Sequence, residues 1–205
     1  MNSWNFDQNS NNNKKAEFTK FPVGVTRITV LDEAPFIRWT HWIQKDRRSV
    51  NCPGRGCPIC EIRKQQKANK EDYTYNMSRR FALNIYNHDT GKVEIMEQGL
   101  GFFEDLRDLK EEIEEGGNTL NNSIIRVKRR GTGKDDTSYR LDIDEVGIQI
   151  PEKVAEDIID LSEYFKAHTP EQVLRIISGE SFDEVMRGTS ENNGNEENEE
   201  DFEVK

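Results

Sequence analysis

The stretch SRRFALNIYNHDTGKVEIMEQG (residues 78–99) contains two runs in which apolar and polar side chains alternate, separated by the four residues HDTG (88–91). Alternation with a period of two is typical of strands that are covered on one face, and a short polar turn ending in glycine is typical of a hairpin. The stretch therefore predicts an antiparallel hairpin whose residues Phe81, Leu83 and Ile85 face a core.

The same alternation extends outward from this hairpin. It predicts strands within residues 22–32 and 36–43 and a second hairpin over residues 123–145. Between the hairpins, apolar residues at helical spacing predict an amphipathic helix over residues 102–115. Five or six short strands with one helix before the last hairpin predict a mainly β fold with accessory helices, closed into a small barrel like the oligonucleotide-binding (OB) fold.

The order of these segments also predicts how the chain is divided. The OB-like core is expected over residues 18–145, with an insertion at about 44–76 where strand periodicity is lost. Residues 146–187 have a helical pattern and are expected to pack on the barrel or to serve as a partner surface. Residues 1–17, rich in asparagine, and residues 188–205, rich in acids, are expected to be disordered.

All three cysteines of the chain lie in CPGRGCPIC, at Cys52, Cys57 and Cys60. A Cys-x-x-Cys turn directs two sulfurs at one point, as a tetrahedral zinc ion requires, and a structural site usually has four protein ligands. We expect His41, eleven residues before Cys52, to be the fourth ligand and the metal to be structural Zn²⁺. His88 in a turn and His168 in an acidic helical region are the poorer candidates.

A redox Cys-x-x-Cys is the competing chemistry for this cluster, but it leaves the third cysteine unexplained. A catalytic zinc ion would need an open coordination position and a general base. No His-Glu-x-x-His or His-x-Glu pattern accompanies the cysteines, and no phosphate-binding glycine loop has the required spacing. We therefore expect that the protein is not an enzyme.

Charge is distributed unevenly along a chain whose formal net charge is −10. Residues 14–80 carry fifteen lysines and arginines against seven acids, a net charge of +8, and residues 126–140 carry a net charge of +4. A clustered positive face matters more for binding phosphates than the total charge does. Two basic segments in an acidic chain therefore point to a nucleic-acid partner.

Strand parity predicts which side chains form that positive face. Cations interleaved with aromatic rings suit single-stranded nucleic acid, because charges follow the backbone while rings stack on bases at about 1–3 kcal/mol per base. The candidate contacts are basic and aromatic side chains of the strands and the cysteine loop, namely Arg38, Trp42, Arg47, Arg48, Tyr73, Tyr75, Arg80, Tyr86, Arg126, Lys128, Arg130 and Arg140.

Over residues 18–144, His41 and the three cysteines among strands that fit an OB barrel, followed by an acidic tail, resemble a known family. This family is the zinc-containing single-stranded DNA-binding proteins of tailed bacteriophages, of the gene-32-product type. The resemblance implies sequence-independent binding and protection of single-stranded DNA in phage replication, recombination and repair. It also implies a place in the cytoplasm of an infected bacterial host.

The acidic tail is similar to tails that recruit replication and recombination proteins, with Asp201 and Phe202 as candidate partner contacts. A different interpretation is a zinc-ribbon factor whose metal loop docks on a polymerase, with the barrel as scaffold. The chain contains no apolar run of eighteen residues and no secretory pattern at its beginning, so we expect a soluble intracellular protein without a membrane partner.

Overall fold

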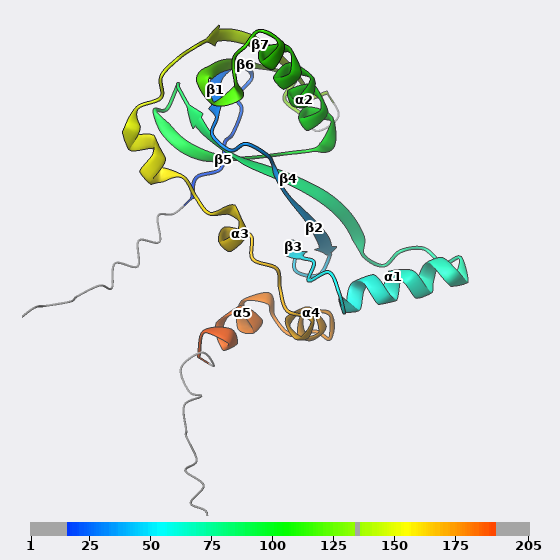
Figure 1. Cartoon of the computed structure of the whole chain (residues 1–205). Coiled ribbons are helices and arrows are strands. Elements are labelled where there is room, and N and C mark those ends of the chain that lie inside the picture. Colours follow the sequence, from blue (N-terminus) through cyan, green and yellow to red (C-terminus); the bar gives the residue numbers. More distant parts are fainter. Residues whose placement is uncertain (1–15, 134–135, 192–205) are drawn as a thin grey trace, which may run out of the picture. The chain divides into compact units, whose positions relative to one another are not determined.

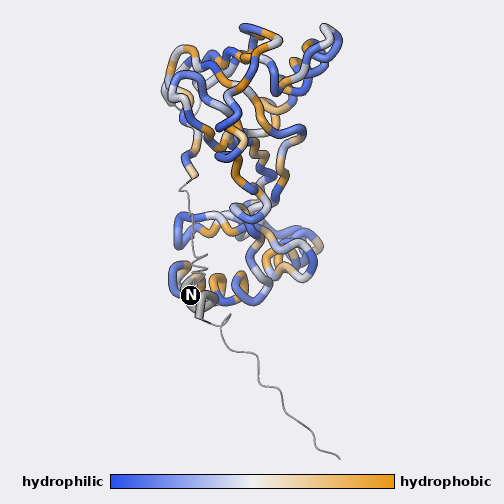
Figure 2. Tube along the Cα trace, turned by 60° about the vertical axis from the view of Figure 1, so that its left-hand side comes forward, coloured by the Kyte–Doolittle hydropathy of each residue, from blue (hydrophilic) through white to orange (hydrophobic). Residues whose placement is uncertain are grey.

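The chain forms two compact units in the computed structural model, which describes residues 16–133 and 136–191 (Figure 1). Hydrophobic segments occur in both units (Figure 2), as expected when each unit has a core of its own. Among the described residues, unit 1 comprises 16–36 and 81–161, and unit 2 comprises 37–80 and 162–191.

Unit 1 contains most of the antiparallel sheet and the longest helix. Its elements are β1 (Gly24–Val30), the second part of β4 (Asn76–Asn87), β5 (Lys92–Gln98), α2 (Leu100–Glu115), β6 (Ser123–Arg130) and β7 (Ser138–Val146), with 3-10 turns at Leu120–Asn122 and Glu152–Asp157. The strands are hydrogen-bonded in the order β5, β4, β1, β6, β7. The prediction of a mainly β fold with accessory helices is confirmed.

The sheet of unit 1 is open rather than closed into the predicted barrel. No ladder joins β5 to β7 within the described part of the chain. The outer edge of β5 is instead occupied by the chain ahead of β1, where Phe18 forms a parallel bridge to Ile95. The Ile95 N–H donates to the Glu17 carbonyl and the Thr19 N–H donates to the Ile95 carbonyl, both at 2.9 Å. These hydrogen bonds occupy the Ile95 N–H and carbonyl on the outer edge of β5, where a neighbouring strand of a closed barrel would otherwise bind.

The core of unit 1 lies between one face of this sheet and α2. Phe81, Leu83 and Ile85 are buried there as their alternation predicts. The helix buries the apolar stripe that its spacing predicts, and the inward residues of β6 and β7 pack against it. The buried members are Phe21, Ile28, Val30, Phe81, Leu83, Ile85, Met96, Phe102, Phe103, Leu106, Leu109, Ile113, Leu120, Ile125 and Val127.

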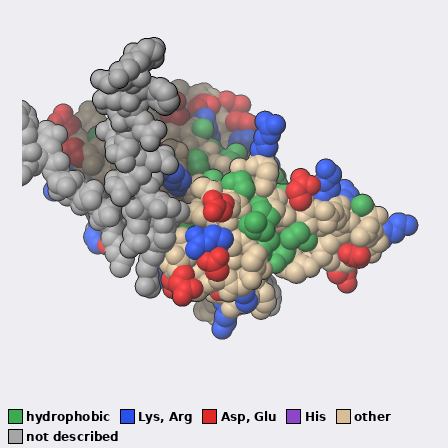
Figure 3. Space-filling view, turned by 90° about the horizontal axis from the view of Figure 1, so that it is seen from below, with side chains coloured by type: hydrophobic (Ala, Val, Ile, Leu, Met, Phe, Trp, Pro, Cys, Tyr) green, Lys and Arg blue, Asp and Glu red, His purple; other side chains and the backbone are tan. Residues whose placement is uncertain are grey.

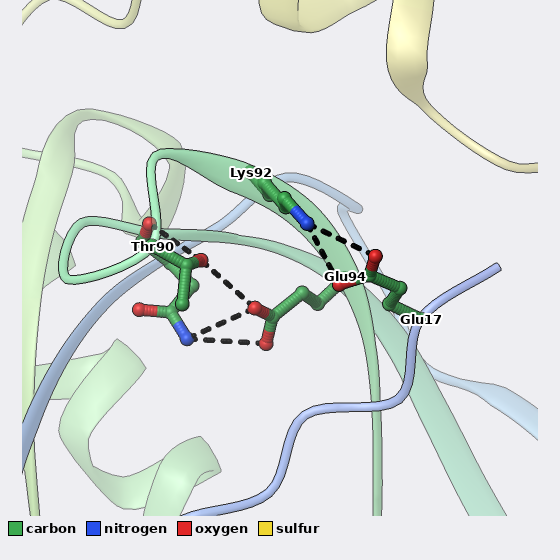
Figure 4. A network of polar contacts seen from close by, with 5 residues as sticks. Glu17, Thr90, Lys92 and Glu94 are labelled. Carbon is green, nitrogen blue, oxygen red and sulfur yellow. Dashed lines mark hydrogen bonds and ion pairs between the residues drawn. The ribbon is translucent and has the colours of Figure 1, made fainter.

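The turn between β4 and β5 is held by a polar network around the buried carboxylate of Glu94 (Figure 4). The Thr90 hydroxyl donates to this carboxylate at 2.8 Å, and the Asn87 amide donates to both of its oxygens at 3.1 and 3.2 Å. Gly91 has φ of +67°, which closes the turn. Buried polar groups are tolerated when they are hydrogen-bonded, so the predicted hairpin is stabilised where it turns.

Unit 2 combines a small strand ribbon with one helix of the cysteine loop and with the C-terminal helices. Its elements are most of β2 (Phe36–Ile43), β3 (Arg48–Asn51), α1 (Pro58–Asn69), the first part of β4, most of α3 (Leu161–Tyr164), α4 (Pro170–Ile177) and α5 (Phe182–Glu191). Within it, β2 is hydrogen-bonded to β3 and β4. The metal-binding insertion predicted at about residues 44–76 falls inside this unit.

Two features of unit 2 differ from expectation. Residues 36–43 were expected to be a strand of the barrel, but from Ile37 onward this strand belongs to unit 2 and pairs with β3, which is too short to produce a visible alternation. The C-terminal helices were expected to pack on the barrel or to face a partner. Val173 and Ile176 of α4 and Val185 of α5 instead share a core with Ile43, Val50, Cys57 and Ile59.

Candidate metal centre and basic groove

The four predicted metal ligands meet at one point of unit 2. His41 lies on β2, Cys52 directly follows β3, Cys57 is the N-cap of α1, and Cys60 lies in the first turn of that helix. The ligand atoms of the four side chains all lie within 4.8 Å of one another. Hydrogen bonding of β2 to β3 brings the histidine to the cysteine loop, because Thr40 and His41 stand opposite Asn51 and Val50.

The separations of these atoms match the edges of a tetrahedral zinc site. Zn–S bonds of ~2.3 Å and Zn–N bonds of ~2.05 Å place two sulfurs about 3.8 Å apart and a sulfur and a nitrogen about 3.6 Å apart. The sulfurs of Cys52 and Cys60 are 3.6 Å apart, and His41 Nε2 lies 3.4 Å from the Cys57 sulfur and 3.5 Å from the Cys60 sulfur. The four side chains are therefore close enough to hold a metal ion.

The backbone of the loop explains why the sequence between the cysteines is rich in glycine. Gly54 and Gly56 have φ of +76° and +77°, a region that disfavours other residues. This conformation lets the Gly54 N–H donate to the Cys52 sulfur at 3.4 Å, while the Gly54 carbonyl accepts the Cys57 N–H at 3.3 Å. Pro58 then starts α1 at a position where a missing N–H costs nothing.

The electrostatics of the cluster suit a cation. Burial, together with the charge of Arg63, lowers the pKa of His41 to about 4, so its imidazole is neutral at pH 7 and Nε2 offers a lone pair. Burial raises the pKa of the Cys60 thiol to about 12 and also raises the pKa of Cys52. Buried thiolates without a cation are costly, and a coordinated metal ion deprotonates them outright. Three thiolates and a neutral imidazole are a donor set that favours zinc.

Apolar side chains cover the cluster on the side of His41 and Cys57, whereas Cys52 and Cys60 are partly exposed. His41 and Cys57 are buried, and Ile43, Val50 and Ile59 pack beside them. Four protein ligands are the arrangement typical of a structural metal site.

The other two histidines do not belong to the cluster. His88 in unit 1 lies 2.8 Å from the Thr29 hydroxyl through Nε2. His168 is buried in unit 2 and accepts the Asn51 N–H through Nδ1 at 2.9 Å. His168 is not a predicted ligand, and no local pattern predicts its contact with the residue before Cys52, because 117 positions separate the partners.

The predicted basic side chains of β6 and β7 line a groove of about 340 Å³ on the outer face of unit 1. Parity placed these side chains outward, and Arg140 is 72% exposed. The groove is lined by Val25, Arg126, Lys128, Arg130, Arg140 and Asp142. Four cations against one carboxylate give the lining of this groove a net positive charge.

The strand register places two of the cations directly opposite each other. Lys128 of β6 is the cross-strand partner of Arg140 of β7, and like charges at such positions are destabilising. Arg27 and Arg126 also stand opposite each other, but Asp144 forms an ion pair with each of them, at 2.8 and 3.5 Å. Arg140 pairs with Asp142 at 3.0 Å. Lys128 and Arg130 form no ion pair with another described residue.

Other predicted contacts have roles inside unit 2. Arg38 donates to the Asn51 side chain and stacks 4.0 Å from the Phe165 ring, while Arg48 pairs with Asp183 at 2.6 Å. Tyr75 packs against the apolar core, whereas Tyr73 is exposed beneath the Arg63 guanidinium, 3.9 Å from its ring centroid.

The other four predicted nucleic-acid contacts differ in how far they are exposed. Trp42 is exposed and donates to Gln44 at 2.9 Å, and Arg47 and Arg80 are exposed. Tyr86 of unit 1 is half-buried with its ring edge against His88.

Strand parity is wrong at three positions. Alternation along residues 36–43 groups Ile37 and Trp39 with His41 and Ile43 and predicts that all four are buried, but Ile37 and Trp39 are 51% and 45% exposed. Alternation with the core residues Leu83 and Ile85 predicts that Asn84 of β4 points outward, but Asn84 is buried, and its amide donates to Asp32 and to the Ile159 carbonyl. Alternation shows which residues share a face and not which face another segment covers. Asp201 and Phe202 lie outside the described residues.

Comparisons of the chain with protein-family models, with curated proteins and with solved structures gave no match. Among the described residues no helix has both the length and the apolar character needed to cross a membrane.

Proposed function

We propose that this chain is a non-enzymatic, sequence-independent single-stranded DNA-binding protein of the zinc-containing bacteriophage type. In this proposal it protects single strands during phage replication, recombination and repair, and its acidic C-terminal residues recruit partner proteins. The observation that carries the proposal is the groove on unit 1, where Arg126, Lys128, Arg130 and Arg140 face a single acid of the lining, Asp142.

The order of elements in unit 1 supports an OB-type fold. Five antiparallel strands follow one another with α2 between the third and the fourth, as in the OB fold. Proteins with this fold bind oligonucleotides on a sheet face. In the proposal, the groove along β6 and β7 follows the phosphate backbone.

Aromatic residues favour single strands over duplexes. Trp42 and Tyr73 are exposed in unit 2, and base stacking on such rings contributes about 1–3 kcal/mol per base. A duplex hides its base faces, so only an unpaired strand gains this energy. In the proposal, a structural zinc ion at His41 and the three cysteines stabilises the unit that carries these rings.

The proposal is tested by titrating a labelled unstructured oligonucleotide and its duplex at several salt concentrations and following fluorescence anisotropy. We expect tight binding of the single strand alone, with affinity falling steeply as salt rises. The double variant Lys128→Gln with Arg130→Gln removes two phosphate contacts. Its log–log salt slope should be shallower by about 1.4, and its affinity at ~0.1 M salt about 10- to 30-fold weaker.

A matched control removes two charges of the same unit from outside the groove. Lys92 and Lys110 pair with Glu17 and Glu114, so Lys92→Gln with Lys110→Gln should leave the salt slope unchanged. If both double variants lost the same affinity for the single strand, the effect would come from overall charge and not from the groove. If the unaltered protein did not bind single strands at low salt, the proposal would be refuted.

A docking factor is the second candidate, favoured by exposed apolar side chains on unit 2. Leu174 of α4 is 52% exposed, and hydrophobic side chains gather on the face shown in Figure 3. If the protein is a docking factor, it should either not bind DNA or bind it with an affinity that Lys128→Gln and Arg130→Gln leave unchanged. The same titration therefore separates the two functions.

A further inference from the structure

The residue before the first cysteine ligand is held unusually tightly. Asn51 ends β3 and has a partner for every polar group. Its backbone N–H donates to His168 Nδ1 at 2.9 Å and its carbonyl accepts the His168 N–H at 3.3 Å. Its side-chain amide donates to the carbonyls of Phe165 and Lys166 at 3.1 Å, and its side-chain oxygen accepts from Arg38.

These contacts join the cysteine loop to the chain between α3 and α4. His168 bonds the free edge of β3 twice, accepting the Asn51 N–H with its ring Nδ1 and donating its backbone N–H to the Asn51 carbonyl. On its other side, the Cys52 N–H donates to the Trp39 carbonyl of β2 at 2.8 Å. The backbone leading into Cys52 is therefore bonded on both sides, to β2 and to the C-terminal segment.

Aromatic and apolar contacts strengthen the same connection. The His168 ring meets Phe182 at 5.6 Å between centroids, and the Arg38 guanidinium that bonds Asn51 lies 4.0 Å from the Phe165 ring. Val173, Ile176 and Val185 of the C-terminal helices pack in the core that includes Cys57 and Ile59. The metal ligands and these helices thus form one packed structure.

From this arrangement we infer that His168 and Asn51 are positioning residues of the metal centre, and that residues 162–186 belong to it although they supply no ligand. The Asn51–His168 contact fixes where the Cys52 sulfur lies. Residues that orient metal ligands typically change metal affinity by about 10- to 100-fold when they are replaced. The inference rests on metal binding by unit 2 and is independent of DNA binding.

The test compares substitutions of His168 in the full-length protein. His168→Leu removes the acceptor for the Asn51 N–H, whereas His168→Asn keeps an acceptor oxygen at the position of Nδ1. Zinc affinity is measured by competition with a chromophoric chelator. We expect His168→Leu to bind Zn²⁺ at least about tenfold more weakly than the unaltered protein and His168→Asn to restore most of the affinity.

A second readout distinguishes positioning from general destabilisation. Alkylation of each cysteine by iodoacetamide in the zinc-loaded protein is measured by mass spectrometry. His168→Leu should accelerate alkylation of Cys52 relative to Cys57 and Cys60. Val185→Ala creates a cavity in the same core and should change the alkylation rates of all three cysteines together. His88→Leu in unit 1 should change none of these rates.

Three results would overturn the inference. One is a zinc affinity of His168→Leu within twofold of the unaltered protein, and another is equal acceleration at all three cysteines. The third is that His168→Asn behaves like His168→Leu, since the acceptor would then be irrelevant. An unaltered protein that binds neither Zn²⁺ nor Co²⁺ would refute both the metal centre and its positioning residues, even if single-strand binding persists.

Discussion

The two units of this chain are stabilised in different ways. Unit 1 packs a five-stranded sheet against α2, and its buried apolar core extends from Phe21 to Val127. Each unit is built from two segments that are far apart in the sequence, but unit 2 buries fewer apolar residues. A small core rarely stabilises a folded unit alone. We therefore expect burial to suffice for unit 1, and we expect unit 2 to require a bound metal ion.

Removal of the metal ion is the strongest test of this comparison. A chelator should unfold unit 2 and leave unit 1 folded, because structural zinc contributes on the order of 10 kcal/mol of folding free energy. Trp39 and Trp42 lie in unit 2, so tryptophan fluorescence in a Trp4→Phe background reports on that unit. Hydrogen exchange of β1 and β6 reports on unit 1.

Cys57→Ser should reproduce the effect of the chelator without any chelator present, because it removes one of the four candidate ligands. If both units unfolded together, or if neither did, the proposed difference between them would be wrong.

The same cavity-creating substitution, isoleucine to alanine, can be made in both cores to test the comparison. Ile125 and Ile176 are both fully buried, in unit 1 and unit 2 respectively. Replacement of either by alanine should lower the free energy of unfolding of its own unit by about 2–5 kcal/mol. Excess zinc should restore the stability of Ile176→Ala and not that of Ile125→Ala, as thermal unfolding with and without Zn²⁺ would show. Loss of zinc affinity in Ile125→Ala would contradict this separation.

A change of pH should act on unit 1 through His88. The Thr29 hydroxyl donates to the Ser123 carbonyl at 2.9 Å, so the His88 Nε2–H donates to Thr29. Burial lowers the pKa of His88, so the neutral imidazole becomes protonated at a higher pH in the unfolded chain than in the folded one. The stability of unit 1 should therefore fall as pH drops below about 6.5. Hydrogen exchange of β1 at pH 7 and 5.5 measures the loss, which His88→Gln should reduce.

The smallest effect is expected from Lys128 alone. Lys128→Gln removes the repulsion with Arg140 across the strands, so it should raise the free energy of unfolding of unit 1 by about 0.2–1 kcal/mol. The same substitution should weaken single-strand binding. Chemical denaturation and the anisotropy titration measure the two effects, and a destabilised protein would show that the cross-strand repulsion is not significant.

Sequence patterns were most informative where one local rule decides the structure. The hairpin at residues 78–99 and the helix that buries Phe103, Leu106 and Ile113 follow from periodicity. The outward position of Lys128 and Arg140 follows from strand parity. Four ligand residues within twenty positions were identifiable because tetrahedral coordination restricts their types and spacing.

Patterns failed where a distant segment decides the environment of a residue. Trp39 is exposed and Asn84 is buried, although alternation assigned each to the opposite environment. Asn84 is buried because Asp32 and the Ile159 carbonyl bond its amide, and neither partner is adjacent to it in the sequence. The predicted barrel remains open at the edge of β5, where the segment around Phe18 pairs instead.

The sequence by itself determined the strands of unit 1, the amphipathic helix and the identity of the four candidate ligands, because periodicity and ligand spacing are local properties. Only the tertiary structure decided that most of β2 belongs to unit 2, that four cations line one groove, and that His168 bonds the residue before Cys52. The reason is physical: long-range packing and hydrogen bonding depend on which surfaces meet, and no local pattern records the partner.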